Sequence, residues 1–231
     1  MKIIKNSALI KRNARIGQWT SLGALGVLGV GMYLSFTRQD LFAYSIGALI
    51  LGFTMTQIGM YFSNRWGRSP RPDEQLDAGL KGLPGDATVY HFAAPAPHLL
   101  VGAMGVWVLL PYHQRGKLTF ENNRWRLRGG GFMQGYMSIF GQEGLGRPDL
   151  EAASQVEAVK RHLESKMGAG QVPPVSPVLV FTNDQIEIDV ADPPLPAVQL
   201  RKLKDLLRQK TKGASIANAT MLSVKESLPQ E

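Results

Sequence analysis

The stretch that decides the fold spans residues 97–131 and reads PHLLVGAMGVWVLLPYHQRGKLTFENNRWRLRGGG. Its first half is almost entirely apolar and is divided by a turn at Ala103-Met104-Gly105. Such runs are typical of strands that are buried on both faces of a sheet. We therefore predict two adjacent strands, over residues 98–104 and 106–110, and a shorter strand over residues 88–93 before them.

The second half of this stretch predicts a β-hairpin. Polar and apolar residues alternate on both sides of Asn122-Asn123, which is the pattern of two strands joined by a two-residue turn. This turn places Glu121 opposite Arg124, Phe120 opposite Trp125, and Leu118 opposite Leu127. One face of the hairpin is then apolar, and the other carries Lys117, Thr119, Glu121, Arg124, Arg126 and Arg128.

Helices and strands alternate in the rest of the chain, which predicts an α/β domain with a mixed sheet flanked by helices. A glycine-rich stretch at residues 129–146 has no clear pattern, and stretches of this kind are often functional. It is followed by a helix from Pro148, which ends at residues 168–170, and by a strand at residues 178–181. The last clear element is a basic amphipathic helix over residues 197–210.

Upstream of this domain, the pattern is that of a membrane anchor. Residues 19–36 and 41–62 are free of charged side chains, and about 20 apolar residues suffice to cross a bilayer. A cleaved signal peptide is the alternative for the first run, but a second run follows at once without a small-residue cleavage pattern. We therefore predict a transmembrane helical hairpin. The small residues at Ala43/Gly47 and Ala48/Gly52 either allow the two helices to pack closely or only reflect the composition of membrane helices.

The flanking charges predict the orientation of this hairpin. Lys and Arg gather before the first span and after the second, and the loop between the spans has only Arg38, which places both termini in the cytoplasm. The resulting organisation is a basic N-terminus (1–16), a two-pass hairpin (17–63), a linker (64–86), the α/β domain (87–212) and a C-terminal tail (213–231).

Net charge and cysteine content limit the classes of partner and of metal site that the chain can have. The net charge is +8 with a pI near 9.8, which points towards nucleic acid or anionic lipid, although part of this charge flanks the apolar spans. The chain has no cysteine, so disulfides and thiolate metal sites are excluded. An unidentified protein partner and a homo-oligomer are also compatible with the sequence.

Few residues offer chemistry. The sequence contains no P-loop and no HExxH motif. His91, His98 and His113 lie in or beside neighbouring strands, which permits a three-histidine metal site, but no carboxylate is spaced to orient them, and we expect ordinary hydrogen-bonded histidines. The row Lys117, Arg124, Arg126 and Arg128 is either a phosphate-binding stripe or the solvated face of an edge strand.

A family resemblance rests on the order of several features. His98 opens a strand, Gly105-Val106-Trp107 begins the next, Gly116 follows it, and Gln155 lies on the later helix. In this order the chain resembles the NERD (nuclease-related) domain, a branch of the PD-(D/E)XK nuclease-like fold. The resemblance covers about half of the chain and implies a restriction-endonuclease-like sheet.

The catalytic motif of that family is missing here. The resemblance places its metal-binding Asp at Pro97, its Glu at Leu110 and its Lys at Tyr112, and such catalysis needs carboxylates to hold the ion. We therefore expect a catalytically degenerate, membrane-anchored binding or scaffold module without a cofactor. The alternative is an active nuclease that binds Mg²⁺ or Mn²⁺ through relocated groups, for which Glu121, Glu143 and Gln155 are the candidates.

Overall fold

The computed structural model describes residues 1–129, 145–168, 170–191, 193–213 and 217–230. The chain forms two compact units. An α/β unit combines Met1–Asn6 with Pro72–Glu231, and a helical unit consists of Ser7–Arg71. The helical unit is therefore an insertion in the α/β unit. The glycine-rich stretch predicted at residues 129–146 lies almost wholly outside the described residues, and so does Glu143.

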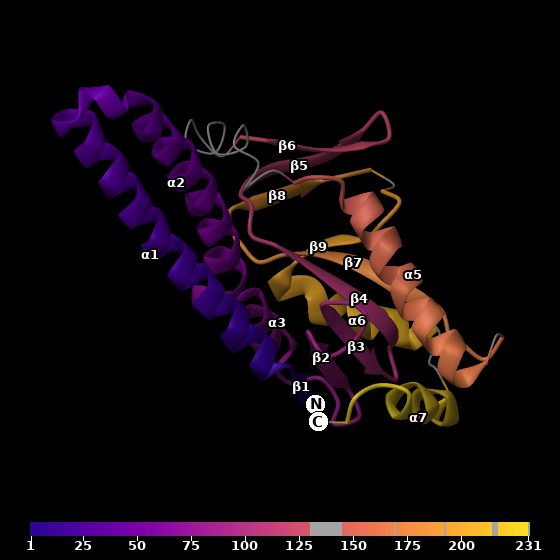
Figure 1. Cartoon of the computed structure of the whole chain (residues 1–231). Helices are drawn as coiled ribbons and strands as arrows, with labels where there is room; N and C mark the ends of the chain where they lie inside the picture. Colours follow the sequence, from indigo (N-terminus) through magenta and orange to yellow (C-terminus); the bar gives the residue numbers. More distant parts are fainter. Residues whose placement is uncertain (130–144, 169, 192, 214–216, 231) are drawn as a thin grey trace. The chain divides into compact units, whose positions relative to one another are not determined.

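The main sheet of the α/β unit has six strands within the described ranges, in the order β1-β2-β3-β4-β7-β9 (Figure 1). Their bounds are Lys2–Lys5 (β1), Thr88–His91 (β2), His98–Gly102 (β3), Gly105–Tyr112 (β4), Val175–Phe181 (β7) and Ala197–Gln199 (β9). Strands β2, β3 and β4 form an antiparallel meander, whereas β1, β7 and β9 pair in parallel with their neighbours. The predicted mixed sheet is confirmed, and all five residues of β3 are buried.

Helices cover both faces of this sheet (Figure 1). Helices α5 (Pro148–Met167) and α7 (Asn218–Glu226) pack on one face, and α3 (Pro72–Leu80) and α6 (Leu200–Gly213) pack on the other. We call these the α5 face and the α3 face. Because side chains alternate along a strand, Leu99 lies in the core under α5, whereas Leu100 lies in the core under α3 and α6.

A second sheet, with three strands among the described residues, has the order β6-β5-β8. Strands β5 (Gly116–Glu121) and β6 (Arg124–Arg128) form the predicted hairpin in the predicted register, with Phe120 opposite Trp125. Asn122 and Asn123 have φ angles of 52° and 58°, as a type I′ turn requires. Strand β8 (Ile186–Asp189) pairs in parallel with β5, and this pairing was not predicted.

The structure assigns several segments differently from the sequence. Strand β1 and helix α3 belong to the α/β unit, although they were assigned to the basic N-terminus and the linker. Leu76 and Leu80 of α3 are completely buried in its core. Residues 197–199 form a strand instead of the first turn of a helix, and the C-terminal tail contributes α7 with Val224 buried.

The helical unit consists of two long helices, α1 (Ser7–Thr37) and α2 (Phe42–Phe62), joined through a 3₁₀ turn at Gln39–Leu41. A single π-helical turn, Ser63–Gly67, follows α2. Small buried residues recur every seven positions on both helices: Gly17, Ala24 and Gly31 on α1, and Ser45, Gly52 and Gly59 on α2. A seven-residue repeat keeps one seam of a helix facing its partner, so this seam holds the pair together.

The contacts along this seam agree with one of the two predicted small-residue pairs and contradict the other. A Cβ at Gly52 would meet the side chain of Leu28, and one at Gly31 would lie 2.8 Å from the Cβ of Ala48. The pair Ala48/Gly52 is therefore at the contact, as predicted. In contrast, a Cβ at Gly47 would have open space around it. The prediction for Ala43/Gly47 was wrong because the small residues that pack repeat every seven positions.

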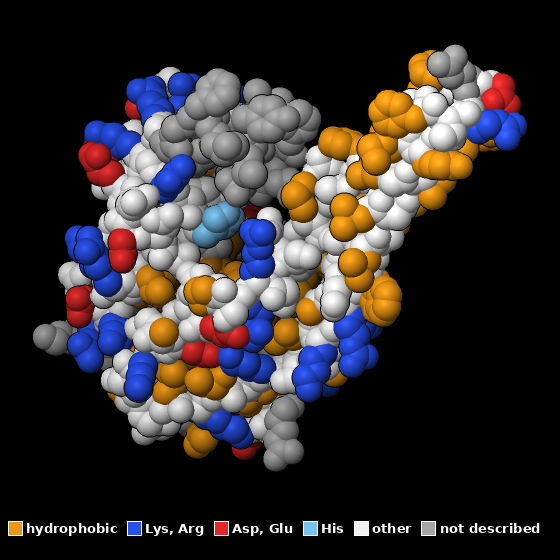
Figure 2. Space-filling view, turned by 90° about the vertical axis from the view of Figure 1, so that its left-hand side faces the viewer, with side chains coloured by type: hydrophobic (Ala, Val, Ile, Leu, Met, Phe, Trp, Pro, Cys, Tyr) orange, Lys and Arg blue, Asp and Glu red, His pale blue; other side chains and the backbone are white. Residues whose placement is uncertain are grey.

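Both long helices are apolar enough to cross a membrane by length and composition. Their outward side chains are strongly exposed, including Trp19, Leu25, Phe36, Tyr44 and Ile50. Figure 2 shows hydrophobic side chains along the surface of this unit.

Candidate functional site

The position where the resemblance expects catalysis lies on the α5 face. Leu110 is 2% exposed and belongs to the apolar core, so it cannot bind a metal ion. Tyr112, two residues further along β4, is on the same face and donates a hydrogen bond from its hydroxyl to Glu151 Oε2, at 2.8 Å. A tyrosine therefore stands in place of the expected Lys, and its hydroxyl is engaged by a carboxylate.

Glu151 also binds Gln155, one helical turn further along α5. The Gln155 side chain donates to Glu151 Oε1 at 3.1 Å, and its own Oε1 is buried without a partner among the described residues. Burial, together with the negative charge and hydrogen bond of Glu151, raises the pKa of Tyr112 well above its usual range. The structure thus brings Tyr112 and Gln155 together through Glu151, which the sequence did not single out, although Glu151 and Gln155 have the i, i+4 spacing of facing residues.

Glu121 and Glu143 are the two carboxylates that the sequence offered as relocated metal ligands, and neither is shown beside Tyr112. Glu121 lies at the exposed end of β5 and forms an ion pair with Arg128, at 3.2 Å, instead of with Arg124 opposite it. Glu143 lies outside the described residues. Among the residues that are described, no group of three or more His, Asp or Glu side chains is arranged to hold a metal ion.

The predicted basic row is divided by its ion pairs. Lys117 binds Asp189 at 2.7 Å and Glu187 at 3.3 Å, both on β8, and these hydrogen bonds raise its pKa. Arg128 is paired with Glu121, as described above. Arg124 and Arg126 are exposed on β6 and have no ion pair in the described part of the chain. Of the basic row, Arg124 and Arg126 (the arginine pair) are thus the two members without an acidic partner among the described residues.

The histidines do not form a three-histidine site. His91 and His98, opposite each other on β2 and β3, share a hydrogen bond of 2.8 Å between their Nδ1 atoms. His91 Nε2 lies 3.0 Å from Asp77 Oδ1 on α3. His113 is exposed just beyond β4. The expectation of ordinary hydrogen-bonded histidines agrees with this geometry.

The same network continues from Asp77 to the N-terminal strand. Lys5 on β1 forms ion pairs with both Asp73 and Asp77, and Asp73 is completely buried. Burial alone would lower the pKa of Lys5, but the hydrogen bonds and charges of the two carboxylates outweigh it and raise the pKa. Burial alone would raise the pKa of Asp77, but hydrogen bonds from His91 and Lys5 outweigh it and lower the pKa.

The hydrogen bonds of this network have defined partners. An ionised Asp77 accepts from the Nε2–H of His91, and between the two facing Nδ1 atoms one imidazole ring donates and the other accepts. The network lies on the α3 face, because His91 and His98 alternate with the buried Tyr90 and Leu99 of the α5 face. It therefore joins β1, α3, β2 and β3 and is separate from Tyr112.

The sequence missed this network because residues 64–86 read as a linker. The only local signal was the spacing of Asp73 and Asp77, which places both on one side of a helix. Comparisons with known proteins add no further assignment: no protein-family model matches the chain, and no curated protein or solved structure matches it at a significant level.

Proposed function

We propose that this chain is a membrane-anchored, cytoplasm-facing and catalytically degenerate nuclease-related domain that acts as a binding or scaffold module. One observation carries the proposal: the positions of the expected Asp, Glu and Lys hold Pro97, the buried Leu110 and the hydrogen-bonded Tyr112. A proline and a leucine cannot bind a divalent cation, which prefers oxygen ligands.

The order of elements supports the relation to nuclease-like sheets. The antiparallel strands β2, β3 and β4 are followed by helix α5, by the parallel strand β7 and by helix α6. Gln155, the expected helical glutamine, lies on α5 and is linked to Tyr112 through Glu151. These features agree with a restriction-endonuclease-like domain that has kept its framework and lost its acids.

The membrane anchor is supported by the surface of the helical unit. Exposed aromatic and aliphatic side chains on α1 and α2 would be costly in water, and a bilayer would cover them. The basic residues before residue 17 and after residue 63 favour a cytoplasmic location for both termini by the positive-inside rule. A reporter fused to the C-terminus tests this orientation, because a signal from the opposite side of the membrane would overturn it.

Nucleic acid is the partner that the arginine pair on β6 favours, since exposed arginines without an ion pair can bind phosphate. The test is fluorescence anisotropy of the full chain in detergent micelles with a labelled oligonucleotide, over a range of salt concentrations. The double variant R124Q/R126Q should bind more weakly, with a salt slope reduced by about 2.

A matched control removes the same charge from the same hairpin. Lys117 and Arg128 are already held by acidic partners, so K117Q/R128Q should change binding less than R124Q/R126Q does. Equal effects of the two double variants would mean that overall charge, and not the arginine pair, drives binding. No binding by the unmodified chain at low salt would exclude nucleic acid and leave anionic lipid or a protein as the partner.

The alternative function, a metal-dependent nuclease, has one observation in its favour. Glu151 is a carboxylate beside Tyr112, near the position of the missing motif. The full chain should not cleave DNA or RNA with Mg²⁺ or Mn²⁺, because among the described residues no group of three or more His, Asp or Glu side chains is arranged to hold a metal ion. Metal-dependent cleavage that is lost in E151Q, E121Q or E143Q would overturn the degenerate assignment.

A further inference from the structure

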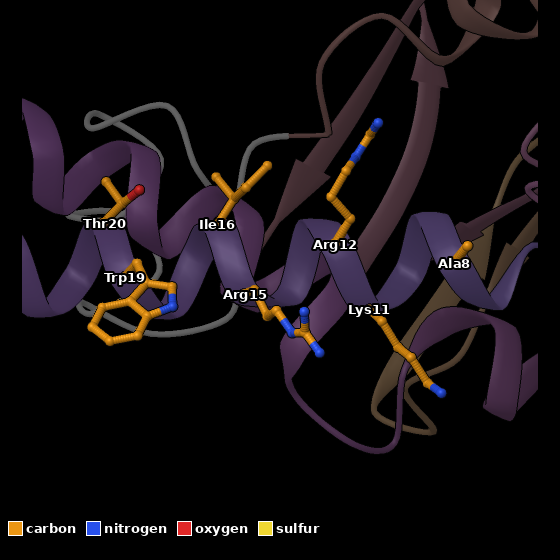
Figure 3. A pocket seen from close by; sticks show the side chains of 7 residues that line it. All are labelled: Ala8, Lys11, Arg12, Arg15, Ile16, Trp19 and Thr20. Atoms are coloured by element: carbon orange, nitrogen blue, oxygen red, sulfur yellow. The ribbon is translucent and has the colours of Figure 1, made fainter.

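The first turns of α1 carry a shallow groove with an unusual lining. It has a volume of about 600 Å³ and lies between two rows of side chains on the same helix. Its lining residues are Ala8, Lys11, Arg12, Arg15, Ile16, Trp19 and Thr20. Figure 3 shows Lys11, Arg15 and Trp19 leaving the helix on one side of the groove and Arg12 on the other.

The positive charge of this groove has no acidic partner among the residues that the structure describes. Within the described residues, Lys11, Arg12 and Arg15 form no ion pair, and the first turn of α1 contains no acidic residue. In contrast, Arg65, which follows α2, lies over the ring of Trp66 at 5.7 Å. The groove therefore gathers three cations that have no acidic partner in the described part of the chain, and an anionic ligand can supply the counter-charge.

The end of the groove that is nearer the uncharged run of α1 is formed by an exposed aromatic side chain. Trp19 is 70% exposed and begins the uncharged run of α1. Tryptophan prefers the boundary between the acyl chains and the headgroups of a bilayer. With a rise of about 1.5 Å per residue, Arg15 and Lys11 lie about 6 and 12 Å further out along the axis. The headgroup region extends about 5–8 Å beyond the hydrocarbon core. Arg15 therefore lies at the level of the lipid phosphates, and the long, flexible side chain of Lys11 can reach back towards them.

We propose that this groove binds the headgroup of an anionic phospholipid. Lys11, Arg12 and Arg15 donate hydrogen bonds to its phosphate, and Ile16 and Trp19 pack against the start of an acyl chain. The proposal rests on the membrane anchoring proposed above and adds the class of lipid that the anchor selects. It commits to lipid and not to free phosphate, because the exposed Trp19 and Ile16 offer apolar surface that inorganic phosphate cannot use.

The test uses brominated lipids, since bromine quenches tryptophan fluorescence on contact. The full chain is reconstituted into vesicles of phosphatidylglycerol and phosphatidylcholine, in which bromine is carried on the acyl chains of either one lipid or the other. Subtracting the signal of W19F isolates the quenching of Trp19. We expect several-fold stronger quenching when the bromine is on phosphatidylglycerol than when it is on phosphatidylcholine at equal mole fraction.

Charge variants then identify the groove. K11Q/R12Q/R15Q should remove the preference, because each of the three cations contributes to the attraction for anionic lipid, and R15Q alone should give an intermediate result. K160Q/K166Q/K202Q removes the same charge from exposed positions of the α/β unit and should keep the preference. Both leaflets have the same composition, so a change of orientation in a variant would not alter the reading.

The outcomes separate this inference from the proposed anchoring. Equal quenching of Trp19 by both lipids would agree with membrane anchoring but would overturn the proposed binding site for anionic lipid. No quenching of Trp19 by either lipid would overturn the anchor and the site together. A preference that disappears when inorganic phosphate is added at constant ionic strength would show that the groove binds free phosphate and would overturn the lipid assignment.

Discussion

The ammonium of Lys5 lies 3.0 Å from Oδ2 of Asp73, although the two residues are 68 positions apart in the sequence. Lys5 is the penultimate residue before the helical unit begins, and Asp73 is the second residue after it ends. This ion pair therefore joins the two segments of the α/β unit, Met1–Asn6 and Pro72–Glu231, next to the point where the helical unit is inserted. It makes β1 and α3 parts of one folded body.

We expect K5M to destabilise the α/β unit by about 2–3 kcal/mol. Removing one partner of a buried ion pair costs about 3–5 kcal/mol, and the cost is smaller here because the Lys5 side chain is 25% exposed. Denaturant unfolding of the full chain in detergent micelles measures it. K2M on the same strand removes an exposed lysine and should change stability by about 0.5 kcal/mol or less. Similar losses in both variants would contradict the role of the ion pair.

A soluble α/β unit should require both β1 and α3, the two elements that flank the inserted helical unit. Replacing residues 7–71 by about eight Gly and Ser residues, which span roughly 15 Å, should give a folded protein, because Lys5 and Asp73 are in contact. A chain that begins at Asp86 loses β1 and α3 and exposes the core beneath Leu76 and Leu80. It should aggregate or show no cooperative unfolding. Equal stability of the two proteins would refute the assignment of β1 and α3 to this unit.

Acid should weaken the network through Asp77. The pKa of this carboxyl group is lowered from its ordinary value of 3.8 in the folded state, so its contribution to stability is present above pH 4 and is lost as the pH falls below that value. The free energy of unfolding of the unmodified chain should therefore fall more steeply between pH 5 and pH 3 than that of D77N. Parallel curves would show that Asp77 does not contribute. Lys5, whose pKa is raised, keeps its contribution throughout this range.

The seam between α1 and α2 should tolerate no side chain at Gly59. A Cβ there would lie 3.1 Å from the backbone nitrogen of Ser21, whereas one at Gly47 would meet nothing within 4 Å. We expect G59L to destabilise the helix pair by about 1–3 kcal/mol and G47L to be neutral. The measurement is loss of helical circular dichroism on titration with a denaturing detergent. If G47L were as harmful as G59L, the seven-residue seam would be wrong.

The tight start of β5 gives a further test. Gly116 has a φ of +113°, and a Cβ there would lie 2.5 Å from the carbonyl oxygen of Arg128. Because the contact is with backbone and the φ angle disfavours any other residue, G116A should destabilise the hairpin by more than about 1 kcal/mol. Thermal unfolding followed by tryptophan fluorescence reports this through Trp125. G85A, where a Cβ has open space, serves as the control.

Local patterns were sufficient where the partners are close in sequence. The alternation around Asn122-Asn123 predicted the register of β5 and β6, because a two-residue turn leaves only one pairing. The apolar runs predicted β3 and β4, and the spacing of the apolar residues after Pro148 predicted α5.

The remaining assignments depend on partners that are far apart in the sequence. Nothing near Lys5 predicts that it meets Asp73, and nothing near Lys117 predicts the acids of β8. A strand of four residues and a helix of nine have weak intrinsic preferences, and the burial of their side chains against the sheet decides their structure. The sequence by itself determined the local elements. Only the tertiary structure decided which charges are neutralised and which remain exposed, because long-range packing brings those side chains together.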